Sequence, residues 1–252
     1  MSHRLPSLLS ATLFEDTVFR RILKYKAKLV VVLAIAFIAN VALARNSSSY
    51  APRGMQSVET VTNLNSSGPG SLAEIISDPT VDTIAFDASL DNGTIAGLGI
   101  FINRDLTIDA SNLPNGITLQ GAGTSPVITI LSGTVILKNL TITNPTIDSP
   151  FANGGIANFS TVTIENCYFT NIGTGDGPTS SAGVFNNSGA QMTLTNVSFG
   201  NITSVSGVRN EGTLEMRNVT LNNVDTDNTI NGLGIVFNAA SGTVSANHVT
   251  IY

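Results

Sequence analysis

The side chains with most potential for chemistry are acidic residues in three segments that separate predicted strands. Two carboxylates at a suitable separation can hydrolyse a glycosidic bond, and clustered carboxylates can also bind Ca²⁺. An aromatic residue in the first segment adds an apolar contact. The resulting candidate binding residues are Asp148, Phe151, Asp176, Asp225 and Asp227.

The placement of these residues favours binding over catalysis. The segments 144–154, 172–182 and 224–233 recur at the same place in a repeat, so they should protrude from one side and form a shallow acidic groove. The run DTDN at 225–228 has some character of a Ca²⁺ loop but lacks the other ligands. We therefore predict solvated loop carboxylates, with no catalytic residue, metal ligand or cofactor. Binding of Ca²⁺ stays open as an alternative.

A repeated unit must position these segments. It reads VILKNLTITN (135–144), VTIENCYFTN (162–171), MTLTNVSFGN (192–201), LEMRNVTLNN (214–223) and VSANHVTIY (244–252). We align FINRDLTIDA at 101–110 as an earlier copy. Successive copies are 22 to 34 residues apart, which is typical of a solenoid of stacked coils.

Each unit alternates with a period of two. In the second full copy Val162, Ile164, Cys167 and Phe169 are apolar, while the intervening positions are mostly polar. This pattern predicts two short strands with one buried face. A third short strand precedes the pair at 155–159, 183–187, 207–211 and 235–239. Three short strands per repeat predict an all-β parallel β-helix, in which like residues stack on like residues.

The centre of each unit should form a turn column. A sharp bend between two strands needs a residue that tolerates the left-handed region, and Asn is favoured there. Stacked Asn amides can also hydrogen-bond along the column. We interpret His248 as a turn residue and Cys167 as a small buried hydrophobe rather than a reactive thiol. The predicted column is Asp105, Asn139, Asn166, Asn196, Asn218 and His248.

The N-terminal region has the features of an export signal. Residues 1–44 contain a basic stretch, then sixteen largely apolar residues that end in an A-x-A pattern. We predict a signal peptide over 1–44, a linker over 45–58 and a secreted or cell-surface location. An uncleaved signal anchor is the alternative, although sixteen residues are few for a membrane span.

Residues 59–90 are predicted to cap the solenoid, whose coils occupy 91–252. A bare β-helix end exposes strand edges and therefore needs a cover. Ser71 and Glu74 form a capping-box pattern that begins a short amphipathic helix, and Pro79 ends it. We see no matching cap before Tyr252. We therefore expect either truncation of a longer chain or self-association through the last coil.

Three strings carry a resemblance to a known class. They are VTNLNSSGPGSLAEII (61–76), DTIAFD (82–87) and DLTIDASNLPNGITLQG (105–121). This region resembles the N-terminal part of bacterial right-handed parallel β-helix proteins of the pectin-lyase-like class, which include secreted and adhesin-like proteins. The GGI at 154–156 and the F-x-N pairs ending at Asn171 and Asn201 are faintly similar to repeats of chlamydial polymorphic outer-membrane proteins. The resemblance implies a right-handed β-helix, a fold that carries both enzymes and binding proteins.

Composition narrows the function classes. Charged residues are only 12% and the net charge is −5, with half of the twelve Lys and Arg before residue 45. The rest of the chain lacks the basic surface that nucleic acid or anionic lipid requires. We predict a structural or adhesin-like β-helix that binds an unknown surface or a carbohydrate, with no membrane span after signal removal. The alternative is a polysaccharide-active enzyme, pectate-lyase-like or a glycoside hydrolase, that uses the loop acids.

Overall fold

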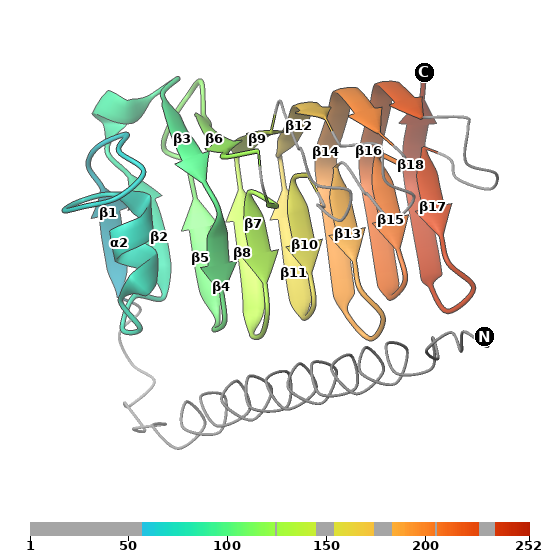
Figure 1. Cartoon of the computed structure of the whole chain (residues 1–252), viewed down its shortest axis with the longest axis horizontal. Coiled ribbons are helices and arrows are strands. Elements are labelled where there is room, and N and C mark those ends of the chain that lie inside the picture. Colours follow the sequence, from blue (N-terminus) through green and yellow to red (C-terminus); the bar gives the residue numbers. More distant parts are fainter. Residues whose placement is uncertain (1–56, 124, 145–153, 174–182, 205, 227–234) are drawn as a thin grey trace, which may run out of the picture. The chain divides into compact units, whose positions relative to one another are not determined.

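A computed structural model describes residues 57–123, 125–144, 154–173, 183–204, 206–226 and 235–252. Over these residues the chain is a parallel β-solenoid of about six turns (Figure 1), as the repeat pattern predicts. The predicted signal peptide lies outside the described residues. Among the described residues, no helix is long and apolar enough to cross a bilayer.

The solenoid has three faces, and every strand pair in it is parallel. Face 1 comprises β1 (Val58–Val61), β2 (Thr83–Phe86), β5 (Leu106–Asp109), β8 (Thr134–Lys138) and β11 (Thr161–Glu165). Face 2 comprises β3 (Thr94–Leu98), β6 (Ile117–Gly121), β9 (Leu140–Asn144) and β12 (Tyr168–Gly173). In the last coils, one bent strand serves both of these faces: β14 (Gln191–Ser204), β16 (Thr213–Thr226) and β18 (Thr243–Ile251).

Face 3 is a separate six-stranded sheet. It contains β4 (Ile100–Ile102), β7 (Ile128–Ile130), β10 (Ile156–Asn158), β13 (Val184–Asn186), β15 (Val208–Asn210) and β17 (Val236–Asn238). Each of these strands has three residues, so face 3 is narrow along the strand direction. Four copies of the third strand were predicted from the sequence, and they contain β10, β13, β15 and β17.

The core lies inside the coils and is built from the alternating apolar positions. Val162, Ile164, Cys167 and Phe169 are at most 3% exposed. Phe169 stacks on Phe199 of the next coil, with ring centroids 4.9 Å apart and planes at 14°. Parallel pairing in register places like side chains above one another, which turns the repeated pattern into a continuous core.

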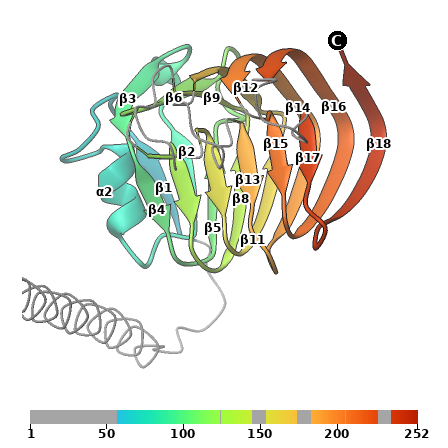
Figure 2. The same ribbon diagram turned by 45° about the vertical axis from the view of Figure 1, so that its right-hand side comes forward.

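The last coil is the exception to this burial. Figure 2 shows β18 at the edge of the solenoid, where its pairing partner among the described strands is β16. Val244 and Ile251, which occupy inward positions of the repeat, are 39% and 51% exposed. Self-association through this coil stays a prediction.

The bends between faces 1 and 2 have the left-handed backbone that the turn column requires. The angle φ is 53° or 54° at Asn139, Asn166, Asn196, Asn218 and His248. A second such column, not predicted from the sequence, lies within the strands of face 2 near their C-terminal ends. It consists of Asn171, Asn201 and Asn223, with φ of 48°, 52° and 51°.

Asp105 does not belong to the turn column, so that part of the alignment was wrong. Leu106 pairs with Val135, which places Asp105 before the face-1 strand, five residues from the predicted position. Its backbone is not left-handed, and its carboxylate accepts a hydrogen bond from Thr134 N at 2.7 Å. The apolar and polar residues of β5 alternate as they do in strands of both face 1 and face 2. Sequence similarity over these few residues therefore could not determine which face β5 belongs to.

The predicted capping helix is present as α2 (Leu72–Ser77), and η1 (Ala88–Leu90) follows it. Ser71 Oγ accepts from Glu74 N at 3.2 Å, and the Glu74 carboxylate accepts from Gly70 N at 2.6 Å. The Arg104 guanidinium donates to the Ile76 and Asp78 carbonyls at 3.1 and 2.9 Å. A cation at the C-terminal end of a helix stabilises it, so β4 and its following turn hold the cap in place.

Candidate functional site

The predicted loop residues fall largely outside the part of the chain that the structure describes. This applies to Asp148, Phe151, Asp176 and Asp227. Asp225 is near the end of β16, where its backbone pairs with Thr203. The acidic groove and the Ca²⁺ alternative therefore stay predictions.

An interior ladder of Asn side chains lies where each coil leaves face 3. The amide of each Asn donates to the side-chain oxygen of the next, at 2.8, 2.8 and 2.7 Å. The first three members are completely buried. Because every buried amide finds a partner in the neighbouring coil, the ladder fixes the stacking of the coils. Its members are Asn158, Asn186, Asn210 and Asn238.

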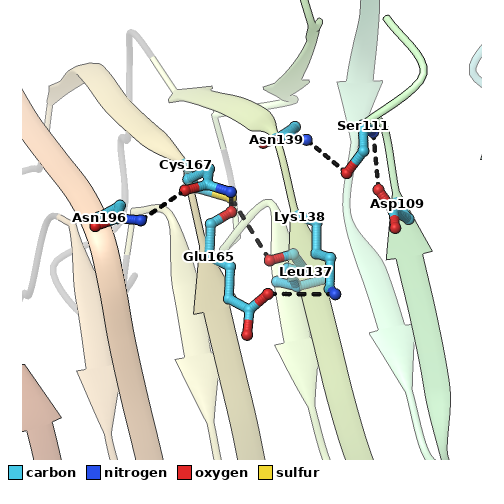
Figure 3. A network of polar contacts seen from close by, with 9 residues as sticks. Asp109, Ser111, Leu137, Lys138, Asn139, Glu165, Cys167 and Asn196 are labelled. Carbon is cyan, nitrogen blue, oxygen red and sulfur yellow. Dashed lines mark hydrogen bonds and ion pairs between the residues drawn. The ribbon is translucent and has the colours of Figure 1, made fainter. Parts of the chain in front are cut away.

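An outer ladder follows the turn column (Figure 3). Asn139 donates to Ser111 Oγ at 2.6 Å, and Asn196 donates to Asn166 at 2.9 Å. Asn218 in turn donates to Asn196 at 2.8 Å. These residues are exposed to different degrees, and their role is to hold the bends in register. Both ladders are structural features rather than chemical sites.

Cys167 lies beneath the outer ladder, and its thiol is unreactive. Its Sγ atom lies 3.3 Å from Glu165 O and accepts from Leu140 N at 3.5 Å. Burial raises the pKa of this thiol to about 12. At pH 8 about one molecule in ten thousand would therefore carry the nucleophilic thiolate.

We expect the native protein to be inert to Ellman's reagent at pH 8. The reason is that Cys167 is only 3% exposed and remains protonated. In 6 M guanidinium chloride the same protein should release one equivalent of chromophore per chain, since Cys167 is the single cysteine. Equal rates in the native and unfolded protein would contradict this.

A group of side chains on the outside of face 3 has the composition of a binding surface. We call Phe159, Phe185, Arg209 and Phe237 the aromatic strip. Phe185, Arg209 and Phe237 are in register on β13, β15 and β17. The Phe159 ring meets Phe185 edge-on, with centroids 6.1 Å apart and planes at 76°.

Arg209 occupies the middle of the strip. Its guanidinium carbon lies 5.5 Å from the Phe185 ring centroid and 5.8 Å from that of Phe237. Both distances are within the range of a cation–π contact. Arg209 Nη2 also pairs with the Glu211 carboxylate at 2.6 Å. The strip is therefore preorganised by its own contacts, with its charge neutralised.

The aromatic strip was not predicted from the sequence, although a signal was present. The strands of face 3 read V-x-N in three successive coils, and x is Phe185, Arg209 and Phe237. Since Val and Asn point inward, x must point outward. An outward Phe is unusual enough to mark a surface, but the repeat is defined by its inward columns, which carry no information about this position.

Other charged groups on the described surface are paired or isolated. Lys138 pairs with Glu165 at 3.3 Å, as Figure 3 shows, and Arg217 pairs with Glu215 at 2.6 Å. Within the described residues, no three His, Cys, Asp or Glu side chains gather as a metal site would require.

A cleft of about 640 Å³ lies between α2 and the start of face 3. Its lining includes Ile76, Leu98, Phe101 and Arg104. The Arg104 guanidinium is engaged with backbone carbonyls of the cap, and Ser66, Ser77 and Asn103 also line the cleft, so its wall is of mixed polarity.

Comparisons with known proteins give no match from which a function could be inferred. No family model matches the chain, and neither the curated proteins nor the solved structures contain a match. The parallel β-solenoid is thus established by the structure alone.

Proposed function

We propose that the protein is an exported, adhesin-like β-solenoid that binds the surface of a partner protein through the aromatic strip. The signal-like sequence at 1–44 and the resemblance to secreted β-helix proteins support export. The solenoid supplies a rigid sheet, so the strip needs little ordering when it binds.

The arrangement of Phe159, Phe185, Arg209 and Phe237 carries this proposal. Aromatic residues and Arg are enriched at the centres of protein interfaces and contribute most of the binding energy there. The exposed fraction of Phe159 is 44%, and the Arg209 side chain retains 20%. Phe185 is only 9% exposed, so the accessible apolar area of the strip comes from Phe159 and Phe237. The ion pair of Arg209 with Glu211 limits the cost of burying the guanidinium.

Binding to protein films tests the proposal. Beads coated with the full chain would be applied to films of fibronectin, collagen and mucin. We expect adhesion to at least one film, and we expect Phe159→Ser and Phe237→Ser each to weaken it about tenfold or more, as for interface hot spots. Phe101→Ser is the matched control, because Phe101 is 62% exposed on the same sheet but lies outside the strip, on β4, which β7 separates from β10.

Unchanged adhesion of the strip variants, with wild-type circular dichroism, would contradict the proposal. So would turnover of pectin or alginate that Asp176→Ala abolishes, because that result would favour the enzyme alternative. An assay for reducing ends and unsaturated products measures this turnover directly.

A further inference from the structure

Face 2 carries an outward column in which every residue has a hydroxyl group. Strand register places these residues opposite one another from β3 to β18. Neighbouring parallel strands lie about 4.8 Å apart, so these hydroxyl-bearing residues form a regular row along the solenoid. We call this the hydroxyl column: Thr94, Thr118, Thr141, Tyr168, Ser198, Thr220 and Thr250.

The column beside it is also uncharged. Gln120 is opposite Thr143, and Thr170 is opposite Gly200, which is opposite Asn222. From β6 to β16, the residues in these two outward columns therefore include no ionisable group except the Tyr168 phenol. Face 1 differs, because Lys138, Glu165, Glu215 and Arg217 point outward there as ion pairs.

Tyr168 forms a flat aromatic platform within this neutral face. The side chain is 41% exposed, and its outer end lies over Gly200 of the next coil. A Cβ atom at residue 200 would come within 2.6 Å of the Tyr168 hydroxyl and about 3.3 Å of the ring. The glycine therefore lets the ring lie along the sheet rather than stand away from it.

We propose that face 2 binds a neutral polysaccharide, with one sugar ring stacked on Tyr168. A pyranose ring has an apolar C–H face that fits a flat aromatic ring, and hydroxyl groups at its rim. The Thr, Ser and Asn side chains around Tyr168 can both donate to and accept from those hydroxyls. An anionic polymer would find no cation on this face to offset its desolvation.

The row of hydroxyls also indicates how the polymer lies. A chain parallel to the solenoid axis meets a new hydroxyl at each coil, so several weak contacts act together. This site is independent of the aromatic strip, which lies on face 3 and is proposed to bind protein.

Affinity electrophoresis of the full chain tests the proposal. The native gels would contain hydroxyethyl cellulose, glucomannan or polygalacturonate. We expect at least one neutral polymer to retard the protein and polygalacturonate to leave its mobility unchanged. Tyr168→Ala should weaken the retardation about tenfold, the value of roughly one stacked ring, whereas Tyr168→Phe should retain it.

Gly200→Val provides a second, independent variant. The added side chain should displace the Tyr168 ring from the sheet and weaken retardation while the tyrosine itself remains. Phe101→Ala is the matched control, since it removes a 62% exposed ring from face 3 outside the aromatic strip, and its retardation by the polymer should equal that of the wild type. Melting curves check that each variant is folded. If Gly200→Val proves unstable, the result for Tyr168→Ala decides the test.

Three results would overturn the proposal. They are the absence of retardation by both neutral polymers, equal retardation by polygalacturonate, and wild-type retardation of folded Tyr168→Ala. Because the strip variants are tested on protein films, failure here is distinguishable from failure of the proposed function.

Discussion

Replacing Asn186 with leucine is expected to lower the free energy of unfolding by about 3–5 kcal/mol. The Asn186 amide donates to Asn210 Oδ1 at 2.8 Å and to Thr213 O at 2.9 Å, and its oxygen accepts from Asn158 at 2.8 Å. The residue is completely buried. Leucine is similar in size, but it leaves three polar groups in the interior without these partners, and each costs about 1–3 kcal/mol unless it finds another.

Urea titration followed by circular dichroism measures this change. The matched control is Asn187→Ala in the same coil, where the side chain is half-buried and donates to Ser188 O at 3.4 Å. The control should change the free energy by about 0.5 kcal/mol or less. If the two variants unfolded at the same urea concentration, the interior ladder would not be the stabilising element described above.

Phe199→Ala should also destabilise the protein by about 3–5 kcal/mol. Phe199 is 1% exposed and stacks on Phe169 at the centre of the solenoid. The ring also fills the space next to Gly183, whose Cβ, if present, would come within 2.8 Å of it. Truncation leaves a cavity between two coils, and the regular backbone hydrogen bonds on either side hinder its collapse.

Two further variants show whether volume is the cause. Phe199→Leu retains most of the apolar volume and should cost about 1.5 kcal/mol or less. Phe159→Ala removes an exposed ring and should cost about 1 kcal/mol or less. A loss for Phe199→Leu as large as that for Phe199→Ala would point to the ring stack rather than the cavity. Thermal unfolding of the three variants in one buffer ranks their losses of stability.

The repeat in the sequence was sufficient to predict the coil. Alternation is a local property, and by itself it identified inward residues such as Val162 and Ile164. The left-handed bends between faces 1 and 2 were also predictable, because among non-glycine residues Asn tolerates that backbone best. The second column, at Asn171, Asn201 and Asn223, was not predicted. The short helix was predictable from Ser71 and Glu74, which cap its start, and from Pro79, which ends it. These signals are local because they involve residues within one or two helical turns.

Contacts between coils were harder to predict. The segments between strands vary in length, so the residue opposite a given position lies 22 to 30 residues away, a separation that differs from coil to coil. Asp105 was misplaced for this reason. The aromatic strip and the position of Tyr168 over Gly200 depend on the same lateral register, and neither was predicted.

The sequence by itself therefore determined which residues face the core, where the chain bends between faces 1 and 2, and that the strands stack in parallel. These properties follow from hydrophobic alternation and backbone preference, which act over a few residues. Only the tertiary structure decided which outward side chains become neighbours, because that depends on register between coils. Both candidate binding surfaces, the aromatic strip and the hydroxyl column, depend on this register between coils.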